Sequence, residues 1–308
     1  MPERGRRDVG CDNHPRREGQ GDGLCLSLER LRDYRAYTYR TAPDRRVTTL
    51  EGAVRFVEER GFVFFHPVQG PPMPSLWHAV AGDRPVPAEH DDPGHVTWGW
   101  KDSLLGTRRW YYAKVLRRCS TIISMDVVPF FYALSPNYGV PEEDYLIAYE
   151  QGRLSQAAKA IYESLLERGP QDAIALHRSC GMAGKRHAYG FDRGLVELQG
   201  AFMVLPTGVA DAGGWHYAFV YDITARHFPH LPEAARPIHL QDARRRLAQL
   251  YLQSVGAVAV ADIGRLFAWP PIDVDATVNS LVDAHLVRRG VRVPGQRGEW
   301  VAICDLVG

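Results

Sequence analysis

The sequence has no long apolar run, no closely spaced cysteine pair and little net charge, and each absence excludes a class of protein. No segment approaches the roughly 20 apolar residues that a membrane-spanning helix needs, and no apolar stretch of the signal-peptide type follows the arginine-rich start. We therefore expect a cytoplasmic protein that makes no contact with membranes. The cysteines are odd in number and far apart, which is typical of free, buried thiols rather than of a disulfide framework. They are Cys11, Cys25, Cys119, Cys180 and Cys304.

Metal and cofactor motifs are also missing. The loop HDDPGH at 90–95 offers hard ligands, but a stretch rich in proline and glycine rarely holds ligands in a preformed site. His177 and Cys180 give only two ligands, where structural zinc needs four. The segment 181–186 lacks the pattern of a phosphate-binding P-loop, and neither a nucleophile elbow nor a dinucleotide fingerprint occurs. We therefore expect no metal and no cofactor.

Length and charge set broad limits on the protein. With 308 residues, of which 45% are hydrophobic, the chain has the composition of an ordinary globular protein of two or three domains. Its formal net charge is only +1, so any binding to phosphates must come from local clusters. Residues 1–24 are rich in Arg, Asp, Gly and Pro and have almost no apolar side chains, which predicts a disordered tail.

Helical periodicity begins directly after this tail. Apolar residues recur at helical spacing over 26–40 and again over 48–62, where Thr48 is a candidate N-cap and Gly61 a stop signal. A loop rich in proline, glycine and charge follows at 81–95. The pattern predicts two helices before this loop.

The segment 101–134 ends the first domain. Its aromatic and aliphatic residues fall at helical spacing on either side of a β-branched patch, which predicts helices around a short strand. The basic run at 107–118 would then lie on a helix, with its arginines on different flanks. We assign residues 25–148 to a winged-helix-like N-terminal domain.

Two later stretches follow one plan. Over 155–223 and again over 239–308, three helical patterns precede a pair of strand-like segments, which is the order of elements in a winged helix. We therefore predict a middle winged helix at 149–236 and a C-terminal one at 237–308. The chain as a whole reads as mainly α with small β-wings, in the α+β class.

Five segments carry a resemblance that extends over nearly the whole chain. They are LSLERLR at 26–32, EERGFVFFHPV at 58–68, TWGWKDSLL at 97–105, LLERGP at 165–170 and AFVYDITARHFPHLP at 218–232. In this order they resemble the AlkZ/YcaQ-type DNA glycosylases, bacterial enzymes that unhook bulky alkylated bases and interstrand crosslinks. The resemblance implies three winged-helix units in a curved arrangement that holds duplex DNA, with the active site on the concave face.

The chain departs from this family at the catalytic motif. Family members carry Gln-x-Gln or Gln-x-Asp, and alignment on Gly61 and Val68 places Phe64 and His66 at those positions. Cleavage of a glycosidic bond needs a polar group that positions or deprotonates water, and Phe64 cannot supply one. His66 can accept a proton as a neutral imidazole, but a histidine among aromatic residues is also often a hydrogen-bonded core residue. Both interpretations stay open.

A second departure follows in the segment TWGWKDSLL. Trp98 matches the family, whereas Trp100 and Lys101 replace its usual histidine and glutamate. Lys101 can contact a phosphate or, as an amine nucleophile, attack a sugar C1′. A solvated lysine at a helix start is the simpler interpretation and is slightly favoured. Asp102 joins His66 and Lys101 as a candidate catalytic residue.

Basic residues interleaved with aromatic ones mark the candidate DNA-binding surface. Such a mixture suits binding to phosphates and stacking on bases, and the third helix and wing of a winged helix face the DNA groove. A plain charged face, or packing against the next domain, is the alternative. The candidates are Arg108, Arg109, Lys114, Arg117 and Arg118 in the first unit, Lys185, Arg186, His187, Tyr189 and Arg193 in the middle unit, and Trp215, His216 and Tyr217 in its wing.

These observations favour a DNA-binding protein of the AlkZ/YcaQ superfamily with altered or absent base excision. Its expected partner is double-stranded DNA, including alkylated or crosslinked duplexes. One alternative is an active glycosylase in which His66 positions the water. Another is a protein-interaction or small-molecule scaffold on the same fold. The sequence does not indicate an oligomeric state.

Overall fold

One order of elements occurs three times in the described part of the chain: a helix, a short strand, two helices and a β-hairpin. The computed structural model describes residues 24–307 with gaps at 90, 183 and 185–187, so the predicted tail lies almost entirely outside the described residues. The first repeat comprises α2 (Leu50–Arg60), β1 (Phe62–Phe64), α3 (Leu76–Ala81), α4 (Val96–Leu104), β2 (Trp110–Lys114) and β3 (Ser120–Ser124). The second comprises α7 (Gln156–Arg168), β4 (Gln171–Asp172), α8 (Ala173–Ser179), α9 (Ala188–Gly200), β5 (Val204–Ala210) and β6 (Ala218–Ile223). The third comprises α12 (Leu240–Val255), β7 (Ala257–Ala259), α13 (Val260–Phe267), α14 (Pro271–Asp283), β8 (Val287–Val291) and β9 (Trp300–Ile303).

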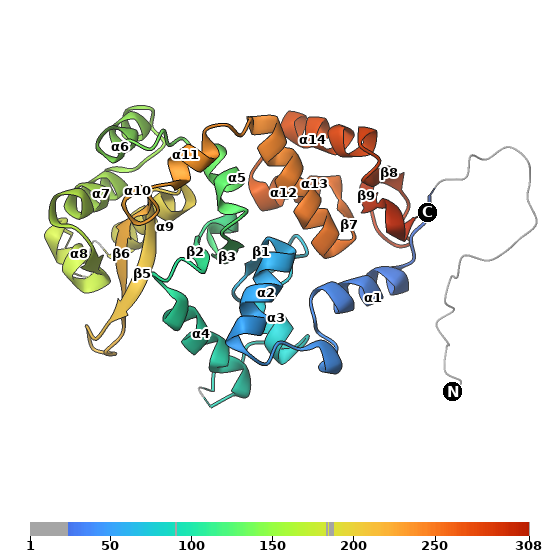
Figure 1. Ribbon diagram of the computed structural model, residues 1–308, viewed down its shortest axis with the longest axis horizontal. Coiled ribbons are helices and arrows are strands. Elements are labelled where there is room, and N and C mark those ends of the chain that lie inside the picture. Colours follow the sequence, from blue (N-terminus) through green and yellow to red (C-terminus); the bar gives the residue numbers. More distant parts are fainter. Residues whose placement is uncertain (1–23, 90, 183, 185–187, 308) are drawn as a thin grey trace, which may run out of the picture.

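The three small sheets also share one topology. In each, the short strand pairs with the last strand of the hairpin, giving the antiparallel orders β1-β3-β2, β4-β6-β5 and β7-β9-β8. The predicted α+β class with small sheets is confirmed, while the winged-helix domain boundaries stay predictions. Figure 1 shows the first repeat in the centre, between the second and the third. The other helices are α1 (Leu28–Thr38), α5 (Val128–Ala133), α6 (Pro141–Glu150), α10 (Thr224–His227) and α11 (Leu231–Ala235), with short 3-10 turns at Pro43–Arg45, Pro93–His95, Leu116–Arg118 and Cys304–Leu306.

Local capping explains where α2 begins and ends. Thr49 rather than Thr48 is the N-cap, and its hydroxyl accepts a hydrogen bond from the backbone N–H of Gly52. The predicted stop at Gly61 is confirmed, because its φ of 78° suits a residue without a side chain. A Cβ at this position would also lie only 2.8 Å from the side chain of Leu250, so the turn packs closely against α12.

The basic run at 107–118 is not helical, and the prediction of a helix there is wrong. Its centre is strand β2, followed by the turn at Leu116–Arg118. Both faces of this strand are buried: Trp110 and Tyr112 face one hydrophobic cluster, whereas Tyr111 faces another. A strand buried on both faces has no polar alternation, so its apolar run cannot be distinguished from a helix by periodicity.

Two hydrophobic cores meet at the sheet of the first repeat. Along β1, Phe62 and Phe64 face a core shared with the third repeat, and Val63 faces a core within the first repeat. The second repeat has its own core around Tyr162. Because side chains alternate between the two sides of β1, Phe64 points away from the cluster around Lys101 that is described below.

The start of the described chain packs against its end. Arg35 of α1 donates hydrogen bonds to the carbonyl oxygens of Val255 and Ala257 at 3.0 and 2.8 Å. The backbone of Leu26 donates to the carbonyl of Arg292 at 3.0 Å. These contacts join residues near 26–38 to the third repeat, and Figure 1 shows α1 beside that repeat.

Cys119, Cys180 and Cys304 are free thiols as expected, but they are half-buried rather than buried. Each lies at an element end, where packing is less complete than within a helix or strand. Among the described residues, no helix has the length and hydropathy needed to cross a membrane.

Candidate functional site

The ammonium group of Lys101 lies inside a ring of aromatic side chains. Lys101 shares the buried face of α4 with Thr97 and Leu104, four and three residues away respectively, and is only 1% exposed. The expectation of a solvated lysine is therefore wrong, because the residue sits mid-helix on the face that packs inward. Cation–π contacts stabilise a positive charge placed among such rings. The Nζ atom lies 4.5 Å from the ring centre of Phe219, 5.0 Å from Trp98, 5.5 Å from Tyr217, 5.7 Å from Phe65 and 5.8 Å from Tyr112.

Three polar groups close a triangle at the centre of this ring. Lys101 Nζ donates to Tyr217 Oη at 2.8 Å and forms an ion pair with Asp102 Oδ1 at 2.9 Å. Tyr217 Oη in turn donates to Asp102 Oδ1 at 2.9 Å. Burial lowers the pKa of Lys101, and the Asp102 carboxylate acts in the opposite direction. Burial and the neighbouring Asp102 raise the pKa of Tyr217, so this hydroxyl keeps its proton.

His66 lies beside this cluster and is half-buried. Its ring centre is 4.4 Å from that of Phe65 and 5.7 Å from that of Trp98. The buried Nε2 atom makes no hydrogen bond with any described residue. Burial lowers the pKa of His66, and the neighbouring His95 and Lys101 lower it further. The imidazole is therefore neutral at physiological pH and can accept a proton.

The remaining motif positions separate into exposed and buried groups. The Trp98 side chain is 42% exposed and covers the cluster from outside. Trp100 is partly buried against the first-repeat core. Phe64 is fully buried on the opposite side of β1 from the Lys101 cluster. The residue aligned with the first family glutamine thus lies in the core, and Phe65 contacts Lys101 instead.

The basic residues between 108 and 118 are all exposed, but two are held by other groups. Arg109 pairs with Glu51 at 2.8 Å, and Arg117 donates to the carbonyl oxygen of Gln69. Arg108, Lys114 and Arg118 are exposed and take part in no ion pair with described residues. Arg108 precedes β2, Lys114 ends it and Arg118 lies in the turn that follows, so these residues lie along a hairpin rather than on a helix face.

The middle repeat presents aromatic groups to solvent. Trp215 is 93% exposed at the tip of the β5–β6 hairpin, and Tyr189 is 78% exposed at the start of α9. A groove of about 390 Å³ is lined by Tyr189 and Arg193, together with Arg118 of the first repeat. Arg193 pairs with Glu197 at 3.1 Å. Lys185, Arg186 and His187 lie outside the described residues.

The β5–β6 hairpin of the middle repeat has two roles. His216 at its tip is exposed and pairs with Asp211 at 2.7 Å. Tyr217, expected to face DNA with its neighbours, instead turns toward Lys101 and is 37% exposed. Sequence reasoning missed this partner and Phe219, because they lie more than a hundred positions from Lys101. A period-two pattern in WHYAF was the available signal, since it places Tyr217 and Phe219 on one face.

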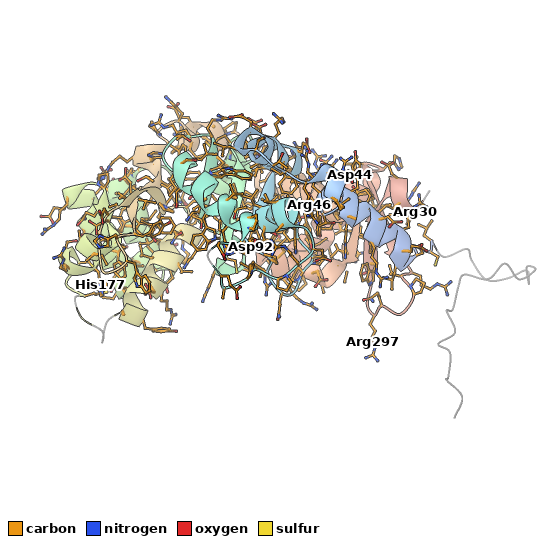
Figure 2. All side chains as sticks on the ribbon, turned by 90° about the horizontal axis from the view of Figure 1, so that it is seen from below. Arg30, Asp44, Arg46, Asp92, His177 and Arg297 are labelled. Carbon is orange, nitrogen blue, oxygen red and sulfur yellow. The ribbon has the colours of Figure 1, made fainter. Side chains whose placement is uncertain are left out.

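The described residues include no group of three or more ligands able to hold a metal. Asp92 is bound bidentately by Arg84, with the two shortest contacts at 2.6 and 2.9 Å, and also accepts from the backbone of Gly94. His177 packs on Phe191. Figure 2 shows that Asp92 and His177 lie in different parts of the molecule, so they do not share a site.

The fold defines a tandem-repeat α+β protein in which a buried lysine cluster joins two repeats. A model of the family described as AlkZ related matches residues 47–268, which is most of the chain, and the protein therefore belongs to the AlkZ-related family. Among solved structures, the chain is similar to the Streptomyces sahachiroi DNA glycosylase AlkZ, with a TM-score of 0.56 and 10% sequence identity. The match covers 92% of this chain and 71% of that one. A comparison with curated proteins finds no match.

Proposed function

We propose that the protein binds duplex DNA, including alkylated or crosslinked duplexes, and that base excision in it is altered or absent. In this proposal the three repeats are winged-helix units. The observation that carries it is the closed triangle of Lys101, Asp102 and Tyr217, in which the charged groups of the cluster beside His66 are bound to one another. The binding is weak and sensitive to salt, because it depends on local clusters in a chain of net charge +1.

Two features support binding to DNA. Exposed basic residues surround the β2–β3 hairpin of the first repeat, and Arg118 lines one groove with Tyr189 of the middle repeat. A fully exposed tryptophan at the tip of a hairpin suits contact with bases or sugars, because it costs little to order and presents a large apolar face. Arginine beside tyrosine provides phosphate contact and stacking in one place.

Two features support altered or absent excision. Phe64 lies in the core, so the position aligned with the first family glutamine offers no polar group to water or sugar. Lys101 is buried and bound, so it has no free lone pair with which to attack C1′.

One observation favours the alternative of an active glycosylase. The Nε2 atom of His66 is unbonded among the described residues, and the lowered pKa keeps the ring neutral. A neutral imidazole beside an exposed tryptophan can position a water at a base stacked on that ring. In this alternative His66 is the base, while Lys101 and Asp102 hold the surrounding rings in place.

The deciding experiment is incubation with duplexes that carry N7-alkylguanine, N3-alkyladenine or an interstrand crosslink, followed by detection of abasic sites. We expect no robust excision by the wild-type protein. Robust excision that disappears in His66→Ala would establish the variant enzyme. Excision that survives His66→Ala would reject both the inert interpretation and the role of His66, and would direct attention to Lys101 and Asp102. Without any DNA binding, a protein-interaction or small-molecule scaffold would be favoured.

A further inference from the structure

A groove in the third repeat has features of a binding site that duplex binding does not explain. Its volume is about 790 Å³, within the range typical of small-ligand sites. It lies between the first turns of α13 and α14 and the loop that joins β8 to β9. Its lining includes Ala261, Gly264, Trp269, Arg297 and Gly298, and it shares no lining residue with the Lys101 cluster.

Trp269 forms an aromatic wall of the groove, and residues with small side chains lie beside it. The Trp269 ring lies 4.3 Å from the Phe267 ring, with an angle of 13° between their planes. This stacking holds the indole in place before a ligand arrives, which reduces the entropic cost of binding. Ala261, Gly264 and Gly298 leave room for a flat group to approach the backbone beside Trp269. The shape therefore suits a planar, largely apolar ring system.

The charged side chains around the groove largely offset one another. Both lining carboxylates are bound by Arg289, which lies 2.7 Å from Asp275 and 2.6 Å from Glu299. Arg297 is exposed, takes part in no ion pair with described residues and points away from the body of the molecule (Figure 2). Arg265 pairs with Asp262 but is still 67% exposed. Arg289 offsets only one of the two carboxylates and Arg297 offsets the other, so any excess positive charge around the groove comes from the adjoining hairpin.

The adjoining hairpin carries this excess. Between 287 and 303 the sequence has four arginines and one glutamate, whereas the β5–β6 hairpin and its loop have two aspartates and no lysine or arginine. Arg288 and Arg292 are exposed along this hairpin, in addition to Arg297. Of these exposed arginines, Arg297 lines the groove together with Trp269, and an arginine near an aromatic platform matches a ligand that alternates phosphates with flat rings.

We propose that this groove binds an unpaired nucleotide of single-stranded DNA. The base stacks on Trp269 over the small side chains, and the flanking phosphates contact Arg297 and Arg292. This goes beyond the proposed duplex binding, because only an unstacked base can present its face to the indole. A duplex contributes phosphates to the same arginines but cannot fill the groove.

The test compares a fluorescent ten-nucleotide oligothymidylate with a duplex of equal length, each titrated into the full-length protein at low salt. Trp269→Ala should weaken binding of the single strand about tenfold and leave the affinity for the duplex unchanged. Ala261→Trp fills the groove and should produce the same selective loss. Arg153→Ala is the matched control, because Arg153 is exposed and takes part in no ion pair with described residues.

Each outcome decides the proposal separately from duplex binding. Equal losses for single strand and duplex, or unchanged single-strand binding by Ala261→Trp, would overturn it. If Trp269→Ala fails to fold, Ala261→Trp gives the decision, because Ala261 is exposed and its replacement leaves the core intact. A wild-type protein that binds the oligothymidylate but no duplex would support this site while rejecting the proposed duplex function.

Discussion

Lys101 of α4 donates a hydrogen bond of 2.8 Å to Tyr217, the residue before β6, and so joins the first repeat to the β5–β6 hairpin of the second. The contact links residues 116 positions apart in the chain. The same ammonium group pairs with Asp102 and lies among five aromatic rings. A buried cation held in this way fixes the position of the β5–β6 hairpin on α4.

Removing the Asp102 carboxylate should therefore lower the stability of the folded protein. Asp102→Asn leaves the Lys101 ammonium buried without its counter-charge, and breaking one side of a buried ion pair typically costs about 3 kcal/mol or more. We expect a lower free energy of unfolding by about 3 kcal/mol in chemical denaturation. The pKa of Lys101 should fall further, because its remaining partners are an uncharged hydroxyl and the aromatic rings.

Lys101→Met is the matched control for this prediction. It removes the charge but keeps most of the side-chain volume, and Asp102 retains the hydrogen bond from Tyr217. The Asp102 side chain is 27% exposed, so water can solvate its carboxylate once the cation is gone, whereas the buried Lys101 ammonium in Asp102→Asn has no such access. We therefore expect a smaller loss of stability than in Asp102→Asn. A Lys101→Met protein less stable than Asp102→Asn would contradict this description of the cluster.

Phe64→Gln tests whether the motif position can be restored. Phe64 is fully buried in the core shared with the third repeat, so the amide would lose its water contacts and leave a cavity. We expect a loss of about 3 kcal/mol in unfolding free energy and no gain in base excision. A variant of wild-type stability that excises alkylated bases would show that this position reaches the functional site.

Stability should fall on mild acidification. Burial lowers the pKa of His66, His78 and His227 below the ordinary value of 6.5. Below that pH the unfolded chain takes up protons that the folded chain does not, so the free energy of unfolding decreases as the pH falls. Chemical denaturation at pH 7.5, 6.5 and 5.5 measures this decrease.

His66→Gln isolates the share of one histidine in this decrease. The amide cannot take up a proton, so the pH dependence of stability between 7.5 and 5.5 should become shallower than in the wild-type protein. His216→Gln is a suitable control, because His216 is exposed at the tip of the β5–β6 hairpin. An equal or steeper dependence in His66→Gln would mean that His66 is protonated in the folded state.

Trp215 should contribute to DNA affinity without contributing to stability. Its side chain is 93% exposed, so Trp215→Ala removes almost no packing. We expect about fivefold weaker binding to duplex DNA at an unchanged unfolding midpoint. Tyr138→Ala is the matched control, because Tyr138 is 72% exposed and lies outside the proposed DNA-binding surface. Equal affinities of the two variants would remove Trp215 from that surface.

Much of the fold could be predicted from local signals. The helix α2 has a capping threonine and a terminating glycine, and the two later repeats each show helical periodicity before a hairpin. The strand β2 was mistaken for a helix, because Trp110, Tyr111 and Tyr112 are buried on alternating faces and leave no polar side in the sequence. Local periodicity carries no information on which core each face meets.

The candidate site was only partly predictable for a different reason. His66, Trp98 and Lys101 all lie in segments that resemble the family, and the structure brings them into one cluster. The burial of Lys101 depends on Tyr217 and Phe219 of another repeat, and no local pattern links such distant positions. A charged residue on a helix is normally solvated, so the favoured expectation for Lys101 failed where tertiary packing supplied partners.

The most direct test of the central proposal is a titration with duplex DNA over a range of salt concentrations. We expect measurable binding at low salt, and a linear fall of the logarithm of the affinity with the logarithm of salt concentration. Arg118→Ala with Arg193→Ala, which removes both arginines that line the groove beside Tyr189, should weaken binding and reduce the salt slope by about two. No measurable binding at low salt, or a slope unchanged in the double variant, would contradict the account.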